Sequence, residues 1–303
     1  MTTRREFLKQ TAGLLVAGTG IGVAAGCRGR NMPTDKIKLP ASYYQQFDAD
    51  FKLDVPGEGY QGWNLGDIEI SRKHTALVVM HAWDMGTRAE YPGWHRAVEY
   101  IPRADKICRT VFPKLLSAVR ESDFKLFHVV GGGDYYRDLA GYKRAVKLTG
   151  EEPPALEQTK PDPVLQALNE FRAKHVFVGK HNEADVNRGF EHVGFPPEAR
   201  PLGDEGIAEN AHQLHALCRD SGVNHLIYAG FAINWCLLAS SGGMLDMSRR
   251  GYMCSAVRDA TTAVENRESA RTESHKEEAL WRVALAYGFV FDADSLIKAF
   301  HGG

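Results

Sequence analysis

Short, continuously apolar runs alternate along the chain with segments of helical spacing. Such runs have the length of strands, and a strand covered on both faces of a parallel sheet is apolar at every position. Six of them are found, at residues 75–80, 124–130, 175–178, 224–229, 252–257 and 288–291. The pattern predicts an α/β fold of three layers, with helices on both faces of a six-stranded, mostly parallel sheet, doubly wound as in Rossmann-like proteins.

Between the apolar runs, hydrophobic residues recur every three or four positions, as on one face of a helix. Helices are expected at residues 104–120, 164–173, 208–220, 269–287 and 293–300. Residues 28–71 are rich in polar and turn-forming residues and are predicted to be a tether followed by an irregular N-terminal extension. Residues 72–303 are expected to form one domain, with a surface insertion at about residues 134–162.

The first 27 residues are typical of an export signal. Arg4 and Arg5 precede Phe-Leu-Lys and an apolar, Gly-rich run, which together resemble a twin-arginine signal and are too short for a stable membrane-spanning helix. The residues before Cys27 resemble a lipoprotein cleavage site, although Ala24 stands where such sites usually carry Leu. Lipidation of Cys27 and simple cleavage both stay open. The protein is therefore expected to be exported, either periplasmic or anchored on the outer side of the cytoplasmic membrane.

Composition narrows the class of protein further. The 303 residues are 44% hydrophobic, which is enough for a sizeable core. The 37 Lys and Arg residues balance 38 Asp and Glu residues, so no nucleic-acid partner is expected. Of the five cysteines, three remain once Cys27 and Cys236 are set aside, and an odd remainder indicates no closed disulfide framework.

Cys236 is the strongest candidate for chemistry. The apolar run at residues 224–229 leads to a turn at Gly230, and Cys236 falls at the start of the following helix, with Asn234 placed to cap it. Unpaired backbone N–H groups and the helix dipole favour a thiolate at this position and could hold a developing oxyanion. A small, buried, inert cysteine at the end of a core strand is the alternative interpretation.

The segment from Gly230 to Cys236 resembles the strand-turn-cysteine motif of the isochorismatase-like cysteine hydrolases, including the Asn two places before the cysteine. Residues 257–260 and 273–280 resemble the closing strand and helix of the same family, so the resemblance spans about residues 75–300. It implies a doubly wound parallel sheet and a catalytic triad of Asp, Lys and Cys. It also implies a cis peptide near Ala232 that helps to shape the oxyanion hole.

Carried over to this sequence, the resemblance makes Cys236 the nucleophile. Lys180 matches the lysine, because it ends the predicted third strand, and its ammonium would stabilise negative charge. The family's Asp is replaced, since His81 follows the first strand. Three alternatives stay open: His81 is itself the general base, Asp84 reaches in from the loop, or acid-base function is lost and the fold is kept for binding.

The remaining site residues follow from the same turn. Backbone N–H groups would hold the oxyanion along the stretch Ala232, Ile233, Asn234 and Trp235. Aromatic side chains near the strand ends could line a small-molecule pocket, namely Trp83, Tyr135, Tyr136 and Trp235. His212 and His215 share a predicted helix face, but no third ligand is evident, so neither a metal nor another cofactor is expected.

The expected function is that of an exported cysteine hydrolase that cleaves an amide or related C–N bond of a small molecule through a thioester intermediate. Family members often assemble, so a homo-oligomer is expected. The alternative is a non-catalytic protein of the same fold that binds a small molecule. The two functions differ in whether His81 or Asp84 lies within hydrogen-bond reach of the Cys236 sulfur.

Overall fold

A computed structural model describes residues 35–151 and 157–302 of the chain. The predicted export signal and the lipidation of Cys27 lie outside these residues. The chain from Asp35 to Gly303 clusters into one unit. Within the described ranges, no helix is both long and apolar enough to cross a membrane.

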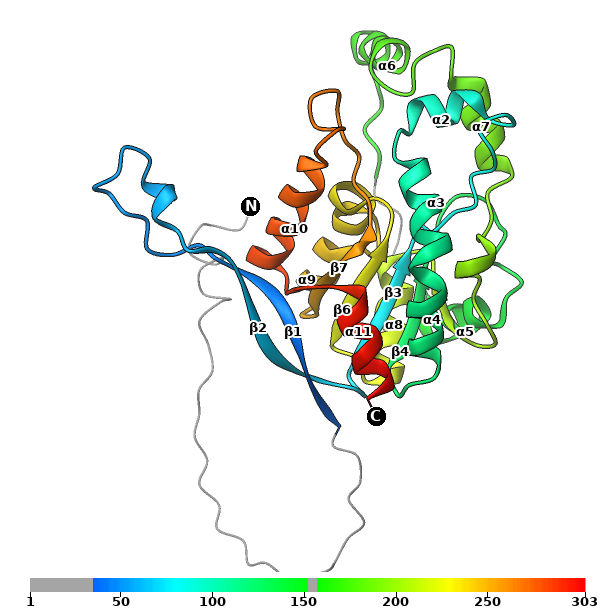
Figure 1. Ribbon diagram of the computed structural model, residues 1–303. Coiled ribbons are helices and arrows are strands. Elements are labelled where there is room, and N and C mark those ends of the chain that lie inside the picture. The colour runs from blue at the N-terminus through cyan, green and yellow to red at the C-terminus, as the bar shows by residue number, and fades with distance from the viewer. Residues whose placement is uncertain (1–34, 152–156, 303) are drawn as a thin grey trace, which may run out of the picture. The chain divides into compact units, whose positions relative to one another are not determined.

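Six parallel strands form the centre of this unit's sheet, and helices surround the sheet (Figure 1). In the order β8-β7-β6-β3-β4-β5 they are β8 (Val290–Phe291), β7 (Met253–Thr261), β6 (His225–Gly230), β3 (Thr75–Met80), β4 (Lys125–Val129) and β5 (Gly206–Ala208). All six residues of β3 are buried, and Val79 is paired in register with His128 of β4 and with Ala229 of β6. The continuous apolar run in β3 is explained by this double enclosure.

An antiparallel hairpin extends the sheet to eight strands, so the predicted six-stranded, mostly parallel sheet is incomplete. β1 (Lys36–Gln45) and β2 (Gly62–Ser71) pair over their full length, and β1 meets β8 only at Ser42 and Val290. Pro40 and the glycines of this stretch suggested irregular structure. Proline is tolerated in strands that lack a neighbour on one side, and beyond β2 the strand β1 meets β8 at a single pair of residues.

The predicted strand at residues 175–178 is wrong. His175 ends the helix α6 (Pro163–His175), and Val176 and Phe177 beyond it are 59% and 55% exposed. The strand that follows β4 is instead β5, whose last residue, Ala208, was predicted to start a helix. An apolar run of four residues does not separate a buried strand from an apolar helix end, and three residues are too few to show a strand pattern.

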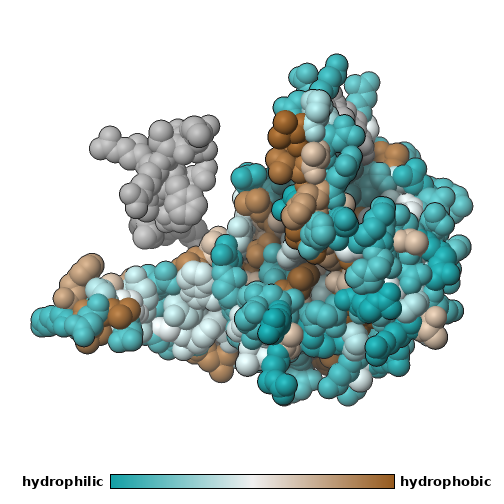
Figure 2. Space-filling view, turned by 90° about the horizontal axis from the view of Figure 1, so that it is seen from above, coloured by the Kyte–Doolittle hydropathy of each residue, from teal (hydrophilic) through white to brown (hydrophobic). Residues whose placement is uncertain are grey.

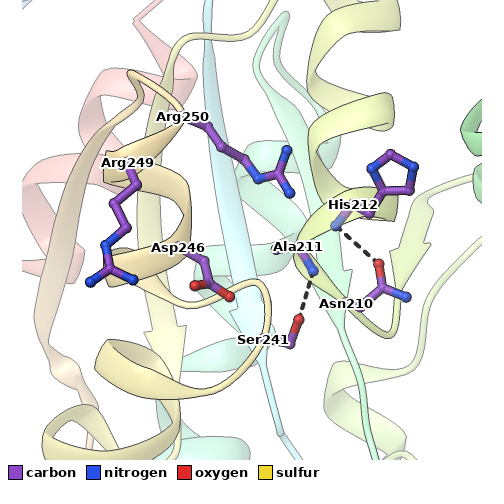
Figure 3. A pocket seen from close by; sticks show the side chains of 7 residues that line it. All are labelled: Asn210, Ala211, His212, Ser241, Asp246, Arg249 and Arg250. Carbon is purple, nitrogen blue, oxygen red and sulfur yellow. Dashed lines mark hydrogen bonds between the residues drawn. The ribbon is translucent and has the colours of Figure 1, made fainter. Parts of the chain in front are cut away.

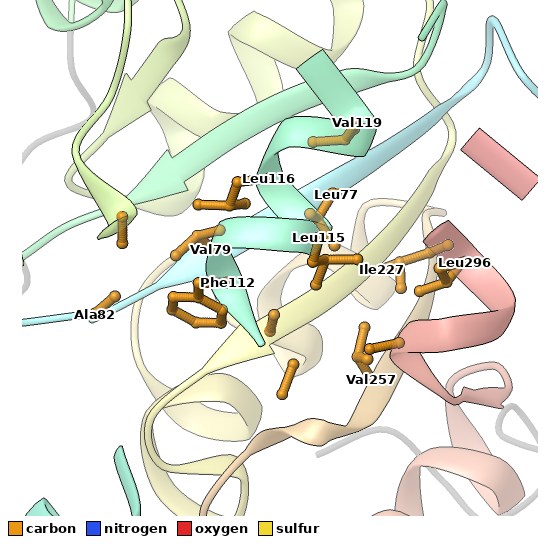
Figure 4. Close-up of a cluster of buried hydrophobic side chains, with 14 of the residues drawn as sticks. Leu77, Val79, Ala82, Phe112, Leu115, Leu116, Val119, Ile227, Val257 and Leu296 are labelled. Carbon is orange, nitrogen blue, oxygen red and sulfur yellow. The ribbon is translucent and has the colours of Figure 1, made fainter. Parts of the chain in front are cut away.

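Helices cover both faces of the sheet and give the expected three layers. One face is covered by α3 (Ile101–Thr110), α4 (Phe112–Arg120) and α11 (Ala293–His301). The other is covered by α5 (Ala140–Thr149), α8 (Ala211–Ser221), α9 (Met244–Arg249) and α10 (Ser274–Ala286). Figure 4 shows the first core, in which Leu77 and Val79 of β3 pack near Phe112 and Leu116 of α4. Ala76, Val78 and Met80 point into the second core.

Two further helices, α2 (Pro92–Ala97) and α7 (Glu183–Glu191), pack against each other. Short helical turns are η1 (Pro56–Gly59), η2 (Pro197–Ala199) and η3 (Ile233–Leu237). The stretch expected to be a surface insertion contains α5, whose Gly141 and Ala145 are buried. A Cβ on Gly141 would lie 1.8 Å from the Glu205 carbonyl oxygen, so the helix packs closely at the start of β5.

Gly230 lets the end of β6 approach the end of β3 closely, and its substitution tests the importance of this approach. Its φ is +123°, and a Cβ there would lie 1.9 Å from the Met80 carbonyl oxygen. We expect Gly230→Ala to lower the free energy of unfolding in urea by about 3 kcal/mol or more. Gly251→Ala is the control, because φ is +91° there but no atom lies within 4 Å of the added Cβ. Equal losses in the two variants would show that the close approach to Met80 is unimportant.

Candidate active site

Neighbouring strands end together at the carboxyl edge of the sheet, where sites of open parallel sheets usually lie. His81 follows β3, Gly131 comes soon after β4, Glu209 follows β5, and Cys236 lies six residues beyond the end of β6. His81 N–H donates to the Val129 carbonyl oxygen at 2.9 Å. The backbone therefore holds the polar residues of different strands at one edge.

The turn after β6 presents Cys236. The peptide bond between Phe231 and Ala232 is cis, as the family resemblance implied. A single π-helical turn, η3, follows, in which Trp235 and Leu237 N–H donate to the Ala232 carbonyl oxygen at 3.2 and 3.1 Å.

The amides of this turn divide into two groups. Ile233 N–H donates to the Thr262 carbonyl oxygen at 2.7 Å, and Trp235 N–H is engaged within the turn. No described residue accepts a hydrogen bond from the N–H of Ala232 or of Asn234. Two of the four amides predicted to hold an oxyanion are thus free to bind negative charge.

Asn234 does not cap a helix, contrary to the sequence-based expectation. The first turn begins at Ala232, so Asn234 lies inside it, and its side chain makes no capping bond. Instead, its Nδ2 donates to the Val264 carbonyl oxygen at 2.8 Å, and Val264 N–H donates to its Oδ1 at 2.9 Å. This pair of bonds fastens the cysteine turn to the segment that follows β7.

Cys236 differs from the other described cysteines. All four, Cys108, Cys218, Cys236 and Cys254, are free, and only Cys236 is not buried. Burial raises the pKa of Cys108 and of Cys218 to about 12 and that of Cys254 further. Because the thiolate is the reactive form, these three are unsuited to nucleophilic attack near neutral pH.

Tyr100, at the start of α3, lies near Cys236 and was not anticipated. Burial raises the pKa of its hydroxyl, and the negative charges of Cys236 and Glu99 raise it further. The phenol is therefore neutral and can act only as a hydrogen-bond donor or acceptor. Its distance of 136 positions from the cysteine in sequence left no local signal.

His81 is a neutral, largely buried imidazole. Burial lowers its pKa to about 4. Its ring stacks on Trp83 with centroids 4.8 Å apart, and its buried Nδ1 has no hydrogen-bond partner. A Cβ on Gly131 would lie 3.3 Å from Nε2, so the glycine makes room for the ring. The φ of His81 is +51°, a left-handed conformation that costs a non-glycine residue about 1 kcal/mol and is often found at functional sites.

Trp83 connects His81 to an aromatic wall. Its Nε1 donates to the Tyr135 hydroxyl at 3.1 Å, and its ring meets Phe190 edge-on at 5.8 Å. Trp83 and Tyr135 were predicted to line a pocket, whereas Phe190 of α7 was missed. Trp235, also predicted there, is 57% exposed.

Neither His81 nor Asp84 makes a hydrogen bond with the Cys236 sulfur in the described part of the chain. Asp84 is exposed, and its Oδ1 accepts a bond from Gly86 N–H at 3.0 Å. Burial is the main cause of the raised pKa of Asp105, and the negative charge of Asp84 also raises it. Asp84 therefore lies beside α3 near Asp105.

Lys180 lies in a loop at the surface, which removes the basis of its assignment. Its side chain is 74% exposed and pairs with Glu183 at 2.6 Å, and this contact raises the pKa of the lysine. The residue that follows the third parallel strand of the chain is Glu209, which accepts a hydrogen bond from the Tyr136 hydroxyl at 2.8 Å. A carboxylate thus occupies the strand end to which the resemblance assigned an ammonium. The sequence signal that could have identified this strand end was the short apolar run before Asn210, the residue that caps α8.

The predicted histidine pair has other contacts. His212 Nε2 lies 3.4 Å from the Glu151 carbonyl oxygen, and His215 Nδ1 lies 2.7 Å from the Tyr252 hydroxyl. Within residues 35–151 and 157–302, no group of three or more His, Cys, Asp or Glu residues is arranged to hold a metal ion.

A hollow of about 490 Å³ lies at the amino end of α8 (Figure 3). Arg250 points toward Ala211 in this hollow, and Ser241 Oγ accepts a hydrogen bond from Ala211 N–H at 3.0 Å. The Asn210 Oδ1 accepts hydrogen bonds from the N–H groups of His212 and Gln213 and so caps the helix. Neither Cys236 nor His81 lines the hollow, so it is not the predicted substrate pocket.

Acid should destabilise the fold through its buried neutral histidines. Burial lowers the pKa of His81 and His225 to about 4, against about 6.5 in an unfolded chain. Between these values the unfolded chain binds protons that the folded chain does not, so stability falls as the pH is lowered through this window. We expect His81→Gln to reduce the loss of unfolding free energy between pH 7 and pH 5 by about 2 kcal/mol, as measured in urea. An unchanged loss would contradict a neutral, buried His81.

Comparison with known proteins gives structural likenesses only. No protein-family model matches the sequence, and no curated protein matches it. A cysteine hydrolase from Pseudomonas syringae pv. phaseolicola is 16% identical, with a TM-score of 0.44, over 77% of this chain and 95% of that one. An isochorismatase-like hydrolase from Alkaliphilus metalliredigens is 18% identical, with a TM-score of 0.42, over 75% and 98%.

N-carbamoylsarcosine amidase from Thermoplasma acidophilum is 17% identical, with a TM-score of 0.39, over 73% of this chain and 97% of that one. With TM-scores of 0.44 or lower, these likenesses identify neither a substrate nor a mechanism. The chain resembles the isochorismatase-like cysteine hydrolases both in its motifs and among solved structures.

Proposed function

We propose that the chain is a hydrolase that cleaves an amide or related C–N bond of a small molecule, with Cys236 as the nucleophile. One observation carries this proposal. Cys236 alone among the described cysteines is accessible, and it lies on a turn where the Ala232 and Asn234 amides are free. A nucleophile beside unused N–H donors is the arrangement that acyl transfer needs.

The proposed reaction has two steps. The Cys236 sulfur attacks the carbonyl carbon, and the thiol proton passes to His81, directly or through one water, because Nδ1 has no other partner. The free amides of Ala232 and Asn234 hold the oxyanion. The C–N bond breaks as the amine takes the proton from the imidazolium, and a thioester remains on Cys236.

Water then completes the cycle. His81 takes a proton from the attacking water, the C–S bond of the thioester breaks, and the proton returns to the Cys236 sulfur as the acid leaves. Lys180, exposed and paired with Glu183, takes no part in this scheme. The wall of Trp83, Tyr135 and Phe190 would contact the apolar part of the substrate.

A second candidate is a non-catalytic protein that binds a small molecule through His81 and the aromatic wall. The specific observation in its favour is that no hydrogen bond joins Cys236 to His81 or Asp84 in the described chain. Glu209 at the place expected for a lysine points the same way. Catalytic hydrogen bonds are often long in unliganded sites and shorten with substrate, so the hydrolase remains the first proposal.

We also propose export through the twin-arginine type signal of residues 1–27, with Cys27 lipidated or the signal simply cleaved. Cell fractionation and mass spectrometry of the mature N-terminus would separate these outcomes. A full-length chain confined to the cytoplasm would refute export and leave the proposed chemistry untouched.

Alkylation of Cys236 at pH 7, followed by peptide mass spectrometry, tests the proposed chemistry. Because His81 would take the thiol proton as the carbon–sulfur bond forms, we expect His81→Ala to slow alkylation at least tenfold. His215→Ala, which changes a histidine outside the site, should leave the rate unchanged. The buried Cys108, Cys218 and Cys254 should stay unmodified in the folded protein, which also reports that each variant is folded.

Activity completes the test. A panel of small primary and secondary amides should reveal a substrate whose turnover falls by about a thousandfold or more in Cys236→Ala. The binding function is correct instead under three conditions together. The substitution His81→Ala leaves the alkylation rate unchanged, and no amide of the panel is hydrolysed. A small molecule also protects the fluorescence of Trp83 from quenching.

A further inference from the structure

The tip of the β1–β2 hairpin, defined here as residues 47–60, exposes a set of apolar side chains. Phe51 is 86% exposed, and Phe47, Leu53 and Val55 also lie open to solvent. Figure 1 shows the hairpin projecting from the body of the fold, and Figure 2 shows apolar residues at its far end. A projecting arm that ends in phenylalanines is a surface that needs a partner.

The helix α6 is a second uncovered apolar surface. All thirteen of its residues are exposed, and none is buried. Val164, Leu168 and Phe171 follow one another at helical spacing on one face, and Val176 and Phe177 continue the apolar surface beyond the last turn. A helix of this length is marginal in water without packing, so its apolar face indicates a missing contact.

The charges on these two surfaces are opposite. The hairpin tip carries four acidic residues against one basic one, Lys52, and the acidic residues are Asp48, Asp50, Asp54 and Glu58. The last turn of α6 carries Arg172, Lys174 and His175, and Glu170 is the one acidic residue of the helix. An acidic tip is repelled by anionic lipid and attracted to a basic protein surface, which favours a protein partner over a membrane.

We propose that the hairpin tip of one copy packs against α6 of a second copy, and that the second copy returns the same contact. A two-fold axis makes the exchange reciprocal and closed. The two surfaces together expose on the order of 1,000 Å² of apolar area per copy, which compares with about 800 Å² per partner in a standard interface. This dimer does not rest on the proposed activity.

Sedimentation velocity on the full chain tests the contact. We expect a dimer whose dissociation constant rises at least tenfold in Phe47→Ser/Phe51→Ser and, separately, in Leu168→Ser/Phe171→Ser. Leu202→Ser is the matched control, because Leu202 is 55% exposed but lies in neither surface. Asp54→Lys and Lys174→Glu should each weaken the dimer, and the two changes together should restore it at least in part.

Cross-linking identifies the surfaces that meet. When a Phe51→Cys copy is mixed with a Leu168→Cys copy, peptide mass spectrometry should find a disulfide between positions 51 and 168. A link between two copies of position 51 would overturn the proposal, as would a chain that stays monomeric at 100 µM. So would a monomer that floats with phosphatidylglycerol vesicles and loses this binding in Phe51→Ser.

Discussion

The enclosure of β3 is the constraint on which the rest of the structure depends. All six of its residues are buried, with a parallel strand on each side and a helical layer on each face. Such a strand has no room for an unpaired polar group along its length, so polar chemistry begins only where the strand ends. His81 occupies that first position, and the site at the carboxyl edge follows from the burial of the strand before it.

The ends of three strands are locked together at this edge. Phe231 N–H donates to the Met80 carbonyl oxygen at 3.1 Å, and His81 N–H donates to that of Val129 at 2.9 Å. The backbone thus ties the start of the cysteine turn, the end of β3 and the glycine-rich end of β4 into one rigid frame. Asn234 ties in a fourth segment through its hydrogen bonds with Val264 beyond β7. The position of Cys236 is therefore set mainly by backbone hydrogen bonds between strand ends, and few side chains contribute to it.

Strands enclosed on both faces leave a strong sequence pattern, and strands without that enclosure do not. The bounds of β3 were predicted to the residue, because a strand buried on both faces is apolar throughout. The three-residue β5 and the half-exposed hairpin leave no such run, and both were missed. The missed β5 also bears on the site. Lys180 was matched to the family's lysine because it ends the predicted third strand, whereas the residue that follows the third parallel strand of the structure is Glu209.

The identities of His81 and Glu209 change the electrostatics of the proposed reaction. With Lys180 at the surface, the positive charge available to a thiolate comes from backbone amides and from His81 once it is protonated. Its pKa of about 4 means that charging this imidazole alone costs about 3 kcal/mol more than charging a free one. A stable thiolate-imidazolium pair before substrate binds is therefore disfavoured. The proton should instead move to His81 as the carbon–sulfur bond forms, when the oxyanion at the Ala232 and Asn234 amides carries the negative charge.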